Sequence, residues 1–175
     1  ITLHSDRPIL AFARRMTGYK RLDLLFSNLD RLRALARDHP FQIVIALNAL
    51  AEQYRNQHEY DKGFATLAEA LAAAQQMHSP ARIASVRVTE YRLAIDAGQT
   101  KRAQEALLGA LGALRKIGAK GMVATALVNL SDCYLKLHDY DNAAAFGAQA
   151  YEAANQLNDL WTMAIARVNM GQAYI

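Results

Sequence analysis

Cysteine, proline and tryptophan are scarce in this chain of 175 residues, which holds one Cys, three Pro and one Trp. The single Cys133 excludes an internal disulfide, and its place on an expected helix favours a small packed residue over a reactive thiol. No apolar run is long enough to span a membrane, and no stretch has the pattern of a secretory leader. We therefore expect a reducing, cytoplasmic environment. The few prolines and 53% hydrophobic residues argue against disorder.

A strong excess of one charge is also missing. The formal net charge is +4, and the positive excess falls within residues 1–40, whereas residues 41–175 are close to neutral. The basic balance is therefore no evidence that the second part binds nucleic acid, and we expect neither a nucleic-acid nor a membrane partner. Binding of nucleic acid through the basic stretch 14–37 remains an alternative, which would show as steeply salt-dependent retention on heparin.

Matched positions recur every 40 residues from about residue 41 onward, and large side chains alternate with small ones among them. One unit has Leu47, Leu50, Ala51, Tyr54, Tyr60, Gly63 and Ala70, and a later unit has Leu127, Leu130, Ser131, Tyr134, Tyr140, Ala143 and Ala150. The unit between them matches less well, because Glu90 and Ala94 stand where Leu and Tyr are expected. Small residues let two helices approach and large ones fill the neighbouring groove, so the pattern predicts stacked helix hairpins.

These recurring large and small residues resemble the signature of the tetratricopeptide repeat family over about residues 41–175. The resemblance implies an all-α fold, a right-handed α-solenoid of helix hairpins divided into units 41–79, 80–118 and 119–158 and a half repeat 159–175. Each unit has 40 residues where the family has about 34, so each helix should be nearly a turn longer. Long units of this kind resemble those of bacterial regulators, including sensory segments placed before signalling output domains such as diguanylate cyclases.

Turn and capping residues predict where the helices begin and end. We expect helices over 41–57, 61–77, 80–97, 101–117, 120–137, 141–157 and 160–175. Ser79 and Thr100 are the expected N-caps of two of them, and Asn158 or Asp159 caps the last. Gly109 and Gly112 lie inside a helix, where glycine costs about 1 kcal/mol against alanine, so we expect them to permit close helix–helix approach.

Residues 1–40 do not share the residues that recur every 40 positions in the rest of the chain. Residues 12–21 read FARRMTGYKR, and a Leu-Leu-Phe run, a basic helix-like stretch and the apolar residues 43–46 follow. Over about residues 8–46 this resembles a segment of the α-glucan (glycogen) phosphorylase family, in which Arg15 and Lys20 would match residues that hold phosphate near pyridoxal phosphate. The chain therefore looks chimeric, with a junction near Ala46. We expect residues 1–40 to be helical, notably over 22–38, and packed on the first repeat.

Binding is the favoured class of function. We find no catalytic triad, metal-ligand spacing or phosphate loop in the sequence, so we expect no enzyme activity, metal or cofactor. His58 and His138 occupy the same repeat position, which favours a role in packing the turn over metal binding. Stacked hairpins present a concave face formed by the first helix of each unit. The positions expected to bind a protein or peptide on that face are Asn48, Glu52, Arg55, Asn56, Val88, Arg92, Asp96, Asp132, Leu135, Lys136 and Gln172, with Val128 and Val168 beside them.

Three further expectations concern the origin of the chain, its self-association and an alternative function. The chain begins with Ile1, and the helix at its other end has no packing partner, so we interpret it as a piece of something longer. That helix carries Trp161, Ile165 and Met170, and we expect self-association through it. The alternative function is a fragment of an α-glucan phosphorylase, a pyridoxal-phosphate-dependent glycosyltransferase, in which Arg15 and Lys20 would bind an anion.

Overall fold

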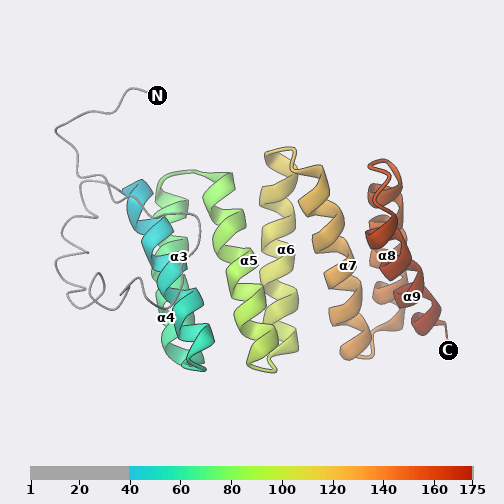
Figure 1. Ribbon diagram of the computed structural model, residues 1–175, viewed down its shortest axis with the longest axis horizontal. Coiled ribbons are helices and arrows are strands. Elements are labelled where there is room, and N and C mark those ends of the chain that lie inside the picture. The colour runs from blue at the N-terminus through green and yellow to red at the C-terminus, as the bar shows by residue number, and fades with distance from the viewer. Residues whose placement is uncertain (1–39, 175) are drawn as a thin grey trace.

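The fold is an all-α solenoid, in which antiparallel helices stand side by side in a row (Figure 1). The computed structural model describes residues 40–174, and their side chains from residue 43 onward. Within this part there are seven helices and no strand: α3 (Pro40–Asn56), α4 (Tyr60–Gln76), α5 (Pro80–Asp96), α6 (Thr100–Lys116), α7 (Lys120–Lys136), α8 (Tyr140–Asn155) and α9 (Leu160–Ala173). The helices expected within residues 1–39, and their packing on the first repeat, lie outside the described residues.

Six turns with the same geometry set the spacing of the helices. A residue with positive φ follows each helix from α3 to α8, and these residues are exactly spaced, one every 20 positions: His58, His78, Gly98, Gly118, His138 and Asn158. At the α5–α6 turn, the Gln99 amide donates to the Ala94 carbonyl at 2.8 Å and the Gly98 amide donates to the Ile95 carbonyl at 3.0 Å. This is the Schellman arrangement, which satisfies the last carbonyls of a helix. The 40-residue period therefore consists of two halves of equal length.

One of the predicted N-caps differs from the structure, and another lacks the expected side-chain hydrogen bond. Thr100 is the first residue of α6, and Gln99 occupies the N-cap position before it. Ser79 is the N-cap of α5 as predicted, but its side chain makes no capping hydrogen bond. Pro80 follows directly, and a proline at the first position of a helix brings no amide hydrogen that would need a partner. Asp159 does cap α9, with its carboxylate accepting from the Thr162 amide at 3.1 Å.

The core follows the alternation of large and small residues. Alanines with no exposed surface lie where helices approach, such as Ala70, Ala110 and Ala150, and fully buried leucines such as Leu67 and Leu107 fill the space between them. The closest helix pairs are α3 with α4, α5 with α6, α7 with α8, and α8 with α9. Burial of this apolar stripe on every helix is what stabilises a repeat that cannot bury its hydrophobic face alone.

The two glycines inside α6 do not both serve a close approach. A Cβ atom added at Gly109 would lie 3.1 Å from Nε of Arg87, so this glycine makes room for a side chain of α5. A Cβ atom at Gly112 would meet nothing within 4 Å, so the expectation of helix–helix contact there is wrong. Glycines in α4 and α8 have less room, because a Cβ atom would lie 2.9 Å from Cδ2 of Leu93 at Gly63 and 2.7 Å from Cγ of Met170 at Gly147.

Candidate functional site

The predicted binding positions on α3 and α5 lie together on one surface. Nη1 of Arg92 lies 3.0 Å from Oε1 of Glu52, one full repeat away, and Nη1 of Arg55 lies 3.4 Å from Oδ2 of Asp96. Nε of Arg55 also contacts Oε2 of Glu52 at 3.0 Å. These four residues, which we call the α3–α5 charge network, balance to zero net charge. The network joins two repeats into one continuous polar surface.

The same surface continues on both sides of the network. On α3, the Asn48 amide donates to the Ser85 hydroxyl of α5 at 3.3 Å. On α7, Nζ of Lys136 pairs with Oδ2 of Asp132 at 2.8 Å. Among the remaining predicted positions, Asn56 and Gln172 are exposed and Val88 and Leu135 are half-buried. We call the exposed side of α3, α5, α7 and α9 the first-helix face.

One residue expected beside the binding positions, Val128, is not exposed on the first-helix face. Val128 is buried, with 5% of its surface exposed, and its carbonyl accepts a hydrogen bond from the Asn169 amide of α9 at 3.2 Å. Contact between α7 and α9 therefore covers the position that the repeat pattern would leave open. Val168, one residue before Asn169, is 58% exposed and does extend the face.

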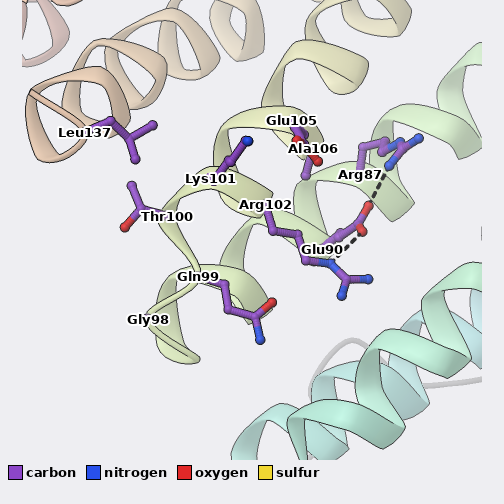
Figure 2. A pocket seen from close by; sticks show the side chains of 10 residues that line it. All are labelled: Arg87, Glu90, Gly98, Gln99, Thr100, Lys101, Arg102, Glu105, Ala106 and Leu137. Atoms are coloured by element: carbon purple, nitrogen blue, oxygen red, sulfur yellow. Dashed lines mark hydrogen bonds and ion pairs between the residues drawn. The ribbon is translucent and has the colours of Figure 1, made fainter. Parts of the chain in front are cut away.

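A second polar concavity, which the sequence did not predict, opens on the α5–α6 hairpin (Figure 2). Its volume is about 860 Å³. Glu90, whose side chain is only 13% exposed, contacts Nη1 of Arg87 at 2.7 Å and Nε of Arg102 at 3.3 Å. The Arg102 guanidinium also stacks on Phe64 of α4, 3.5 Å from the ring centroid. Leu137, which directly follows α7, lines the opposite side of the concavity.

The concavity lies where the middle repeat departs from the pattern. In the next repeat, Tyr134 and Phe146 stack with ring centroids 5.1 Å apart. The positions 40 residues earlier are Ala94 and Ala106, so no ring fills the equivalent space. The departure at Glu90 and Ala94 was the sequence signal that could have located this concavity. Because Glu90 is neutralised by two arginines, it contributes to holding α5 and α6 together.

Neither of the two groups with strongly raised pKa values is activated for chemistry. Burial raises the pKa of Cys133 to about 11, and the Asp132 carboxylate adds to the effect. Burial likewise raises the pKa of Tyr91 to about 12. A nucleophilic cysteine needs a lowered pKa, so Cys133 is a packed residue, as the sequence indicated.

The two repeated histidines lie in the turns, as expected. Nδ1 of His58 lies 2.8 Å from the hydroxyl of Tyr60, and Nδ1 of His138 lies 3.1 Å from the hydroxyl of Tyr140. Both histidines have positive φ, so each combines the turn conformation with a side-chain contact to the next helix. No group of three or more His, Cys, Asp or Glu able to hold a metal ion occurs among the residues that the structure describes. Arg15 and Lys20, the predicted anion site, lie outside that part.

Comparison with known proteins supports the fold. No family model matches the chain. A STAND (signal transduction ATPase with numerous domains) protein with a tetratricopeptide repeat sensor, from Pyrococcus horikoshii, superposes with a TM-score of 0.71 at 15% identity, over 87% of this chain and 24% of that chain. BtubC from P. vanneervenii superposes with a TM-score of 0.69 at 21% identity, over 91% of this chain and 66% of that chain. These likenesses show a helical repeat fold.

A different likeness concerns a short stretch of sequence. The chain is 50% identical to glycogen phosphorylase of Aquifex aeolicus (strain VF5) over 46 residues, which is 25% of this chain and 7% of the phosphorylase. The chain thus spans only a small part of that enzyme. The chain is thus similar to helical repeat proteins in its fold and to a glycogen phosphorylase over 46 residues of its sequence.

Proposed function

We propose that this chain is a non-catalytic interaction module that binds a protein or peptide on the first-helix face. The observation that carries the proposal is the α3–α5 charge network, which ties residues one repeat apart, Glu52 and Arg92, into one surface. Solenoids of stacked hairpins use such extended faces for binding. The likeness to a protein whose name includes a tetratricopeptide repeat sensor supports the same class.

The distribution of charge favours a particular kind of partner. Because the four residues of the network neutralise one another, a strongly charged peptide gains little from the α3–α5 end. Toward the other end the face offers Leu135, which is half-buried, and Val168, which is 58% exposed, beside the Asp132–Lys136 pair. A peptide with apolar side chains and few charges, extended or helical, fits this arrangement best.

The proposal is tested by selecting random peptides displayed on phage against the whole chain. Selected peptides should bind Val168→Asp at least about tenfold more weakly, because a charge then replaces an apolar contact of roughly 1.4 kcal/mol or more. Lys101→Glu serves as the control, since Lys101 is exposed on α6 outside this face. The proposal fails if the selected peptides bind Val168→Asp and the wild type with equal affinity.

A signalling role is the finer part of the proposal. We place the chain in the sensory or regulatory part of a larger cytoplasmic signalling protein of bacterial type, with an output domain such as a diguanylate cyclase. Its support is the Pyrococcus horikoshii protein, of which this chain matches 24%. A selected peptide should then change the output activity of the parent protein, and an unchanged activity at saturating peptide would contradict the role.

Self-association through α9 belongs to the same proposal. The most exposed large apolar side chains of the described part lie on this helix, with Leu160 at 75% and Trp161 at 77%, and directly after it, with Tyr174 at 81%. A second copy packed there would remove this surface from water. Light scattering is expected to show a dimer that Trp161→Glu dissociates, and a wild-type monomer at high concentration would refute the idea.

The second candidate function is a fragment of an α-glucan phosphorylase. The 46 residues at 50% identity favour it, and Arg15 and Lys20 would then bind phosphate. The described residues are helical and supply no strand for the doubly wound domain of that family. Absorption of the purified protein in the pyridoxal phosphate band, with phosphorolysis of glucan, would establish this candidate over the first.

A further inference from the structure

A small hollow lies on an edge of the solenoid that the first-helix face does not include. Residues near the turns from α6 to α7 and from α8 to α9 line it, and both turns lie at the upper edge of Figure 1. Its volume is about 270 Å³. It is lined by the end of α6, the start of α7 and the end of α8, through Arg115, Gly118, Lys120, Val123, Ala153, Gln156 and Leu157.

The hollow has an apolar floor and a cationic rim. Val123 and Ala153 are half-buried, and Leu157 is 40% exposed. Arg115 and Lys120 are both exposed, and neither forms an ion pair with any of the described residues. No acidic residue lines the hollow. The positive charge is therefore not neutralised, in contrast to the α3–α5 charge network.

The local helix ends explain only one of these two cations. Arg115 lies in the last turn of α6, where a positive charge is favourable, but Lys120 is the first residue of α7, where the helix dipole favours an acidic group. The first turn of α7 contains no acidic residue, as is also the case in α3, α5, α6 and α9, whereas the first turns of α4 and α8 contain Asp61 and Asp141. Lys120 thus adds unfavourable charge to its own helix, which an anionic partner would offset.

We propose that this hollow is a second docking site, which binds a short acidic segment of a partner protein carrying one aliphatic side chain. The aliphatic group lies between Val123 and Leu157, and flanking carboxylates pair with Arg115 and Lys120. The volume suits such an anchor, because about 270 Å³ is below the range of roughly 300–1,000 Å³ typical of small-molecule pockets. The site does not depend on binding at the first-helix face.

The test uses two fluorescein-labelled, end-blocked peptides, Asp-Glu-Leu-Glu-Asp and the same peptide with serine in place of leucine. Binding to the whole chain is followed by fluorescence anisotropy and by amide shifts in NMR spectra. We expect the leucine peptide to shift the amides of residues 115–123 and 153–157 and to bind about tenfold more tightly than the serine peptide. Rising salt concentration should weaken the binding of both peptides.

A matched pair of variants separates the site from general charge. Lys120→Glu and Lys101→Glu make the same change near the start of neighbouring helices, α7 and α6. Lys120→Glu should weaken the leucine peptide about fivefold, and Lys101→Glu should leave it within about twofold. Equal weakening by both variants, equal binding of the two peptides, or shifts confined to other residues would each overturn the proposal. Tighter binding of a short thymidine homopolymer at the same amides would also overturn it, in favour of nucleic acid.

Discussion

Two glycine-to-alanine substitutions, one in α6 and one in α8, should change the stability in opposite directions. Gly112 lies inside α6 with open space beside it, so Gly112→Ala adds helix propensity without a clash and should stabilise the fold by about 1 kcal/mol. Gly147 lies inside α8, where an added Cβ atom would lie 2.7 Å from Cγ of Met170 and 3.2 Å from Oγ of Ser131. The Ser131 hydroxyl cannot retreat freely, because it donates to the Ala143 carbonyl at 2.7 Å.

Overpacking of this kind costs about 1–3 kcal/mol, so at Gly147 it outweighs the gain in propensity. We expect a net loss of about 1 kcal/mol, and hence a difference of about 2 kcal/mol between the two variants. For a chain of this size, that difference corresponds to about 4–8 °C in the midpoint of thermal unfolding followed by circular dichroism.

A second substitution tests the cause. Met170→Ala removes the closest contacting atom, so Gly147→Ala should cost less in a Met170→Ala background than in the wild type. The reasoning is refuted if Gly147→Ala raises the midpoint as much as Gly112→Ala does, or if the Met170→Ala background leaves the cost of Gly147→Ala unchanged.

Three other predictions concern single side chains. Glu90→Ala should destabilise the protein by about 2 kcal/mol in urea unfolding, because two arginines lose their carboxylate, whereas Ala in place of the exposed Glu105 should change it by less than about 0.5 kcal/mol; equal effects would contradict this. Hydrogen bonds from the first turn of α9 lower the pKa of Asp159 below its ordinary value of 3.8, so this cap stabilises α9 above that pH and is lost on acidification. Hydrogen exchange at neutral pH should be faster in α9 of Asp159→Ala, and unchanged exchange would refute the role of the cap. Since burial raises the pKa of Cys133 from 9.0 to about 11, its contribution to stability is complete below pH 9 and is lost as the pH rises through 11. The unfolding free energy should therefore fall less across that range in Cys133→Ala, and an equal fall would exclude Cys133 as the titrating group.

The sequence alone determined the helices and their register, because both depend on local signals. Turn residues every 20 positions end each helix, and apolar and small residues every 40 positions mark the faces that pack. The same regularity predicted that Glu52 and Arg92 occupy equivalent positions on neighbouring helices, and their side chains meet at 3.0 Å. Errors of one residue, as at Thr100, arise because capping side chains and the first helical residue have similar preferences.

Only the tertiary structure decided what surrounds each position. Glu90 meets Arg102 because α5 and α6 lie against each other, and Val128 is covered because α9 packs on α7. The hollow with Arg115 and Leu157 combines residues from three helices. Periodicity shows which residues share a stripe along one helix, but the depth of burial and the partners of a side chain depend on the shape and charge of residues on the neighbouring helices.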